Sequence, residues 1–207
     1  MEPGTVTVLL GWPSDGPTLR LDYRRFSYAG KFVMSTTGKA VVRTADEAEA
    51  TDEGRAEESA KVEAPGETDG FDDDVLAAVA FNADRTDPET LWLRYVTVRA
   101  DRRGEGIGPK LCRFVAERAA DRGYERVAIA VNNPFAYEAL YRAGFAFTDR
   151  ETGLAELVLA RPADEPAKDR SGTRYCDGLD RYRERDLSPD ERAFLERKRD
   201  AAPPDVS

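Results

Sequence analysis

The sequence contains no histidine, and this absence removes several kinds of chemistry at once. A Ser–His–Asp triad, a Cys–His pair and a histidine-containing metal site all need the imidazole ring. The two cysteines, Cys112 and Cys176, are too far apart in the chain for a metal-binding spacing. We therefore expect no metal site, and we favour a reduced cysteine pair over a disulfide.

Long hydrophobic runs are also missing. No apolar stretch approaches the length of about 18 residues that a membrane-spanning helix needs. The N-terminus has an acid at position two, no basic start and a short apolar stretch, which is unlike a secretory signal. The sequence therefore predicts a cytoplasmic protein without a membrane partner.

Negative charge is concentrated in one segment. The chain has a net charge of −9, yet residues 46–74 alone hold 13 acids and two bases, and the remainder has a small positive balance. That segment has almost no large apolar residue, so it cannot offset its ordering entropy by burial. We interpret residues 44–74 as an acidic, disordered insertion in a hairpin connection. The near-neutral remainder gives no reason to expect a nucleic-acid partner.

Hydrophobic periodicity predicts alternating strands and helices in the rest of the chain. The predicted strands are Thr5–Leu10, Thr18–Tyr23, Lys39–Arg43, Val75–Phe81, Leu91–Val98, Val127–Val131, and a closing hairpin of Phe145–Phe147 with Leu154–Leu159. Helices are predicted over 107–122, from Pro134 to Ala143, and over 189–200, with an ambiguous short helix within 26–33. Residues 1–43 and 75–160 then form one domain. Residues 161–207 form a charged extension, whose helix we expect to be a surface appendage.

The turn Arg103-Gly104-Glu105-Gly106-Ile107-Gly108 lies between a predicted strand and a predicted helix. Such a turn can direct several backbone N–H groups at one anion, next to the positive end of a helix. A P-loop is excluded because Leu111, not Ser or Thr, follows Lys110. A dinucleotide-binding turn is excluded because Pro109 stands where the third glycine belongs. A structural turn without a ligand stays open.

The first of two separated motifs is Arg103-x-x-Gly106-x-Gly108. The second is Asn133-Pro134-Phe135-Ala136 followed by Ala139-Leu140-Tyr141-Arg142-Ala143-Gly144-Phe145. Together, in this order, they resemble the GNAT N-acetyltransferase family. The resemblance covers about Val75 to Leu159. It implies the α/β acyl-CoA N-acyltransferase fold, a mixed, mostly antiparallel sheet flanked by helices, and acetyl-CoA as co-substrate.

The resemblance also implies site residues. Tyr141 matches the tyrosine that protonates the departing thiolate, and Asn133 matches an asparagine that contacts the cofactor. The pantetheine arm would pair with the strand at Val96, Thr97 and Val98. The pyrophosphate would be held by backbone N–H groups of Arg103, Gly104, Glu105, Gly106, Ile107, Gly108 and Pro109.

The sequence departs from the family in three respects. Asn133 stands eight residues before Tyr141, whereas the family spacing is seven. No acid stands in either central strand to act as general base. The pair of N-terminal helices that usually shapes the acceptor pocket is not evident.

We predict an acetyltransferase acting on an amine, either a small molecule or a protein amine, and leave a homodimer open. The alternatives are a non-catalytic acyl-CoA sensor or scaffold and a protein-interaction domain.

Overall fold

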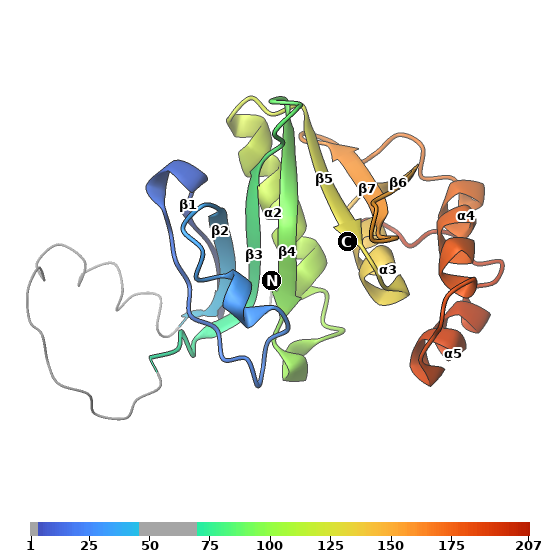
Figure 1. Cartoon of the computed structure of the whole chain (residues 1–207), viewed down its shortest axis with the longest axis horizontal. Coiled ribbons are helices and arrows are strands. Elements are labelled where there is room, and N and C mark those ends of the chain that lie inside the picture. Colours follow the sequence, from blue (N-terminus) through green and yellow to red (C-terminus); the bar gives the residue numbers. More distant parts are fainter. Residues whose placement is uncertain (1–3, 46–69) are drawn as a thin grey trace, which may run out of the picture.

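The computed structural model describes residues 4–45 and 70–207, which form a single seven-stranded sheet with helices around it (Figure 1). The strands are β1 (Thr5–Gly11), β2 (Gly38–Thr44), β3 (Val75–Ala83), β4 (Thr90–Val98), β5 (Arg126–Val131), β6 (Ala146–Glu151) and β7 (Leu157–Pro162). The helices are α2 (Ile107–Asp121), α3 (Pro134–Arg142), α4 (Gly172–Arg183) and α5 (Pro189–Arg197). Three 3-10 turns are η1 (Pro13–Asp15), η2 (Ala29–Lys31) and η3 (Ala100–Arg102).

The strand order is β1-β2-β3-β4-β5-β7-β6, and β4 with β5 is the one parallel pair among the described strands. The parallel pair is connected by α2, as a parallel connection requires a crossover. This arrangement confirms the predicted mixed, mostly antiparallel sheet. The predicted insertion falls in the antiparallel β2–β3 connection, and most of it, residues 46–69, lies outside the described residues.

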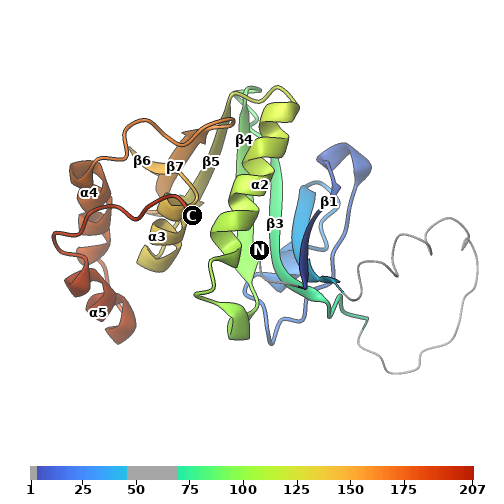
Figure 2. The ribbon, with the colours of Figure 1, turned by 180° about the vertical axis from the view of Figure 1, so that it is seen from behind.

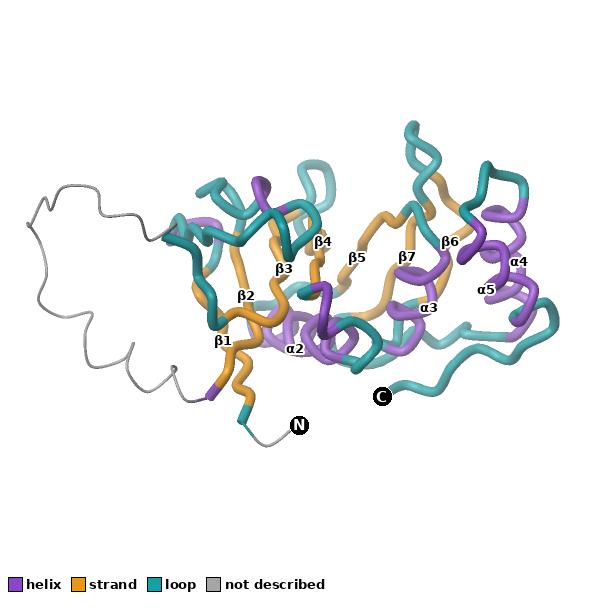
Figure 3. Tube along the Cα trace, turned by 90° about the horizontal axis from the view of Figure 1, so that it is seen from below, coloured by secondary structure: helices purple, strands orange, loops and turns teal. Residues whose placement is uncertain are grey.

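Helices α2 and α3 cover one face of the sheet, which we call the helix face (Figures 2 and 3). The apolar stripe of α2, including Leu111, Val115 and Ala119, is buried against the sheet. Residues 16–37 cover the β1–β4 part of the opposite face, which we call the loop face (Figure 3). There Leu19, Leu21 and residues 26–32 form a second, smaller core.

The prediction that Thr18–Tyr23 is a strand is wrong. Leu19 and Leu21 alternate because both reach the second core, at 1% and 4% exposure, while Tyr23 is 75% exposed. The backbone N–H of Leu19 donates to Phe32 O, and that of Arg20 donates to a carboxylate, so no strand ladder forms. The ambiguous helix within 26–33 is only the turn η2.

A buried lysine holds the loop in place. Lys39 on β2 is 0% exposed, and its Nζ donates to the carbonyls of Pro17 and Met34 at 2.6 Å and of Thr37 at 3.0 Å. Burial lowers the pKa of Lys39. The loop of residues 16–37 is therefore tied to the sheet by hydrogen bonds.

Helices α4 and α5 complete the main core beside α3, so the prediction of a surface appendage is wrong. Helix α4, which we did not predict, buries Tyr175, Leu179 and Tyr182 at helical spacing. Helix α5 adds Phe194 and Leu195. Its start has the predicted capping box, in which Ser188 and Glu191 each accept from the other's backbone N–H.

Candidate active site

The central feature is a split in the sheet. Strands β4 and β5 pair over only four positions, from Thr90 with Arg126 to Leu93 with Ile129, and then separate (Figure 1). The split begins at a β-bulge, because the register of β4 on β3 shifts between Leu93 and Tyr95 and leaves Arg94 as the extra residue. Beyond it, β4 has no strand partner on its β5 side among the described residues. That half of β4 presents free backbone N–H and C=O groups.

The residues predicted to pair with pantetheine lie on this free edge. Val96 and Val98 are partly buried on the helix face, whereas Thr97 is 4% exposed. The buried side chains hold the strand in place. Pairing with a ligand would use the backbone groups at the edge of the strand, which these side chains do not cover.

The glycine turn follows directly at the end of β4. Gly104 and Gly106 have φ of +87° and +78°, which L-residues with a Cβ rarely adopt. A Cβ built on either glycine would meet nothing within 4 Å of the described atoms, so both border open space. Between Gly104 and Gly108, no backbone N–H has a protein acceptor in the described part of the chain. Free N–H groups at the N-terminus of the 15-residue α2 form an anion cradle.

Two positions of the predicted cradle play other roles. Pro109 has no N–H and cannot donate, so its inclusion among the donors is wrong; it sits in the first turn of α2, where a missing donor is tolerated. Gly108 permits close packing, because a Cβ there would come 3.3 Å from Val98 Cγ2. Ile107 begins α2 and packs against the main core.

The charged side chains of the turn bind to neighbouring protein groups. The exposed Glu105 forms an ion pair with Arg102 at 2.7 Å. Arg103 reaches Ser27 Oγ at 3.1 Å and Val98 O at 3.4 Å. The turn is thereby tied to the loop covering the opposite face.

Asn133 lies two residues after β5, on the other side of the split, as the N-cap of α3. Its Oδ1 accepts from the Ala136 N–H at 2.8 Å, and its Nδ2 donates to Asn132 Oδ1 at 3.4 Å. The structure thus gives Asn133 a capping role, and its contact with a cofactor stays a prediction.

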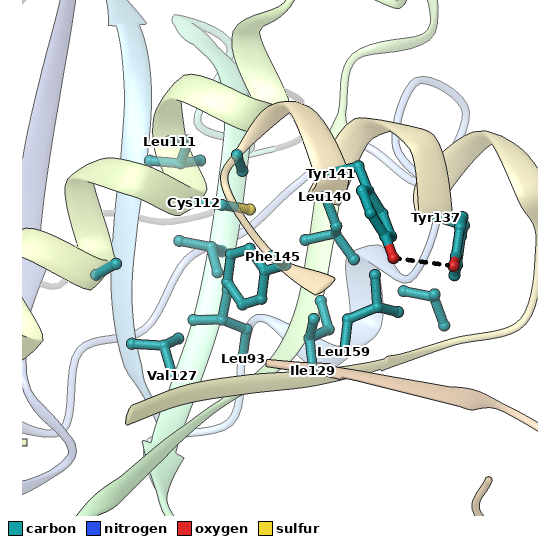
Figure 4. Packing of buried hydrophobic residues seen from close by; sticks show 14 of the residues in the cluster. Leu93, Leu111, Cys112, Val127, Ile129, Tyr137, Leu140, Tyr141, Phe145 and Leu159 are labelled. Carbon is teal, nitrogen blue, oxygen red and sulfur yellow. Dashed lines mark hydrogen bonds between the residues drawn. The ribbon is translucent and has the colours of Figure 1, made fainter. Parts of the chain in front are cut away.

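The structure does not bring the Tyr141 hydroxyl to the split. Tyr141 is 0% exposed, its Oη accepts from Phe147 N–H on β6 at 3.1 Å, and Tyr137 Oη lies 3.3 Å away (Figure 4). Its ring packs against Tyr175, with centroids 4.8 Å apart. Since β7 stands between β5 and β6, this hydroxyl lies on the far side of β5 from β4. Burial raises the pKa of Tyr141.

The spacing of the second motif explains this orientation. The residue seven positions after Asn133, where the family spacing puts tyrosine, is Leu140. One step along an α-helix turns a side chain by about 100°. Leu140 packs in the main core at 4% exposure, while Tyr141 faces α4 and β6.

A buried polar cluster next to Tyr141 was not predicted. Glu138, on α3, accepts from Tyr175 Oη at 2.8 Å, Lys198 Nζ at 2.8 Å and Arg142 Nη2 at 3.0 Å. Burial acts to raise the Glu138 pKa, but these donors outweigh it and the pKa is lowered. A carboxylate so fully engaged is unsuited to act as a general base. The i, i+4 pair of Tyr137 with Tyr141 could have signalled this cluster.

Within the described residues, no group of three or more Cys, Asp or Glu side chains is arranged to hold a metal ion. None of the described helices is long and apolar enough to cross a membrane.

A sequence model of the acetyltransferase (GNAT) family matches residues 40–145, about half of the chain. No curated protein matches significantly. Similar solved structures include a nourseothricin acetyltransferase, which is 19% identical with a TM-score of 0.44 over 61% of this chain and 65% of that one. The match therefore spans just under two thirds of that protein.

Two further structures show the same degree of likeness. A GCN5-related N-acetyltransferase from Kribbella flavida is 20% identical, with a TM-score of 0.42 over 61% of this chain and 67% of that one. The IAA acetyltransferase from Bacillus cereus ATCC 14579 is 17% identical, with a TM-score of 0.45 over 76% of this chain and 99% of that one. At these values the likeness carries nothing about substrate.

Proposed function

Because the chain belongs to the GNAT acetyltransferase family, we propose that it transfers an acetyl group from acetyl-CoA to an amine by direct attack of the neutral amine on the thioester. The observation that carries this proposal is the split between β4 and β5, which leads directly to the free N–H groups of the glycine turn.

The residues at the split fit acetyl-CoA. The free edge of β4 near Val96 and Val98 would pair with the amides of the pantetheine arm. The N–H groups from Gly104 to Gly108 would bind the pyrophosphate in the open space next to Gly104 and Gly106. The fit uses backbone groups, so it depends on strand geometry and glycine conformation rather than on charged side chains.

In the proposed reaction the amine forms a bond to the thioester carbonyl carbon, and the C–S bond then breaks to release the CoA thiolate. Free N–H groups of the β4 edge would stabilise the intervening oxyanion. A thiol has a pKa of about 8.5, so the leaving group needs only moderate protonation. An α-amine, with a pKa near 8, needs little help to lose its proton, whereas a lysine amine, near 10.4, needs more. The family resemblance assigns the acid to Tyr141, whereas its burial leads us to expect a packing role, and Tyr141→Phe distinguishes the two.

A second candidate function is binding of acyl-CoA without catalysis, as a sensor or scaffold. Two observations favour it. The Tyr141 hydroxyl is enclosed in the core, and neither β4 nor β5 contains an acidic residue.

One experiment separates these functions. CoA-thiol release from acetyl-CoA would be followed over a panel of amines, with calorimetry of acetyl-CoA binding on the same protein. Transfer predicts amine-dependent release, and a sensor predicts binding without release. No binding at all would leave the turn as a purely structural element and contradict both.

A further inference from the structure

Two cations without an acidic partner flank the split on the loop face of β4. Lys31 Nζ lies 5.9 Å from the centre of the Tyr95 ring, and Arg94 is the exposed bulge residue next to Tyr95. Among the described residues, no carboxylate lies within 4.0 Å of either cation. Arg94 instead donates to Asn82 Oδ1 at 2.6 Å and lies 5.3 Å from the Trp92 ring centre.

Nearby acids are already engaged. Asp84, which interacts with Arg94 electrostatically, accepts at Oδ1 from the backbone and the hydroxyl of Thr86, both at 2.7 Å. Asp22 pairs with Arg24 at 2.9 Å. Asp84 therefore offsets part of the charge of Arg94, whereas Lys31 has no carboxylate within 4.0 Å among the described residues.

The loop face is the side from which an acceptor can reach the split. Helices α2 and α3 occupy the helix face along β4 and β5, as Figure 3 shows. On the loop face, beyond Arg126 at its start, β5 presents the small side chains of Ala128 and Ala130, and the second core does not extend over them. The acceptor would therefore approach past Lys31, Arg94 and Tyr95.

The loop that contributes Lys31 is fixed against this part of the sheet. The Ala100 N–H donates to Arg25 O at 2.9 Å, and the Tyr28 and Tyr95 ring centres lie 5.9 Å apart. Together with the Arg103–Ser27 contact described above, these interactions hold the loop that carries Lys31 in a fixed position relative to the glycine turn.

We propose that the acceptor is an amine that also carries an anionic group, a carboxylate or a phosphate, which Lys31 and Arg94 bind at the entrance to the split. This inference rests on the proposed acetyl transfer and names the substrate class of the same site. Nearby positive charge also disfavours the ammonium form of the acceptor, so more of it is neutral and able to attack. A cationic entrance thus supplies part of what a general base would otherwise do.

The test measures CoA-thiol release with four short amines of different charge. These are β-alanine, O-phosphoethanolamine, propylamine and 1,3-diaminopropane, and the first two distinguish carboxylate from phosphate. We expect kcat/KM for at least one anionic acceptor to exceed that for propylamine by about tenfold or more, as a charge-assisted hydrogen bond allows. The diamine should be the poorest acceptor.

Lys31→Met and Arg94→Met should each lower kcat/KM for the preferred anionic acceptor by about tenfold, and should lower kcat/KM for propylamine by a smaller factor, because propylamine has no anionic group to bind. Lys168→Met is the matched control, because its side chain is 85% exposed and lies outside the site. A preference for the diamine, or Lys31 and Arg94 variants equal to wild type with anionic acceptors, would overturn the inference and leave acetyl transfer standing. If none of the amines supports CoA-thiol release, the proposed transfer is overturned and the inference with it.

Discussion

Replacing Tyr141 by Phe separates a packing role from an acid role. The ring and its contacts with Tyr175 remain, and only the hydroxyl is removed. Phe147, 2% exposed, then has a backbone N–H without its acceptor, whereas Tyr137 Oη keeps the Tyr175 carbonyl at 3.2 Å. An unsatisfied buried donor costs about 1–3 kcal/mol. At about 2–4 °C per kcal/mol for a chain of this size, the melting temperature should fall by several degrees.

Two assays on the same protein test this reasoning. Urea unfolding gives the loss of stability, and CoA-thiol release with saturating acceptor gives kcat. We expect the stability loss together with a kcat within about threefold of wild type. Tyr137→Phe is the matched control, because it removes an equally buried hydroxyl on the same helix. A fall in kcat of about 10²-fold or more for Tyr141→Phe alone, at unchanged stability, would refute the packing role and support the acid.

Three further predictions concern the cradle, the buried acid and the thiols. Gly106→Val should abolish acetyl-CoA binding measured by calorimetry, while Gly123→Val, with a similar φ of +84° and open space but at the far end of α2, should not. Glu138→Gln should destabilise the protein in urea at pH 7, and this destabilisation should shrink as the pH is lowered, because a lowered carboxyl pKa stabilises the fold above the unfolded value near 4.3 and that contribution is lost as the pH falls through the folded value. Burial raises the pKa of Cys112 to about 12, so mass spectrometry after thiol alkylation should find it unmodified until the protein unfolds, with any native labelling confined to Cys176.

Periodicity in the sequence predicted most of the strands and helices. The helix at 107–122 and the strands flanking it appear within a few residues of their predicted ends, because their apolar residues recur at the period of the element that forms. Thr18–Tyr23 was predicted as a strand because Leu19 and Leu21 alternate with other residues. The same alternation arises when a loop buries two leucines in a core without pairing in a sheet. Helix α4 was not predicted because its three large buried side chains are separated by charged and small residues.

In the candidate site, the backbone features could be predicted from the sequence, whereas the positions of the side chains could not. The glycine turn could be predicted because backbone positions with positive φ favour glycine, and the glycines are visible in the sequence. The direction of Tyr141 could not, since it depends on a one-residue displacement along α3 and on α4, which offers the ring an enclosed position. The cations at the split were also out of reach of sequence reasoning, because Lys31 approaches Tyr95, the neighbour of Arg94, only through the packing of its loop on β4.

The closure of the main core by α4 and α5 affects the order of events during synthesis. Tyr175, Leu179 and Tyr182 are translated after every strand of the sheet, yet they cover α3 and β6. A nascent chain that has already exposed its strands to solvent must keep that apolar surface uncovered until these helices leave the ribosome. Folding of this half is therefore completed late, and stalled or shortened chains would be preferred clients of chaperones and proteases.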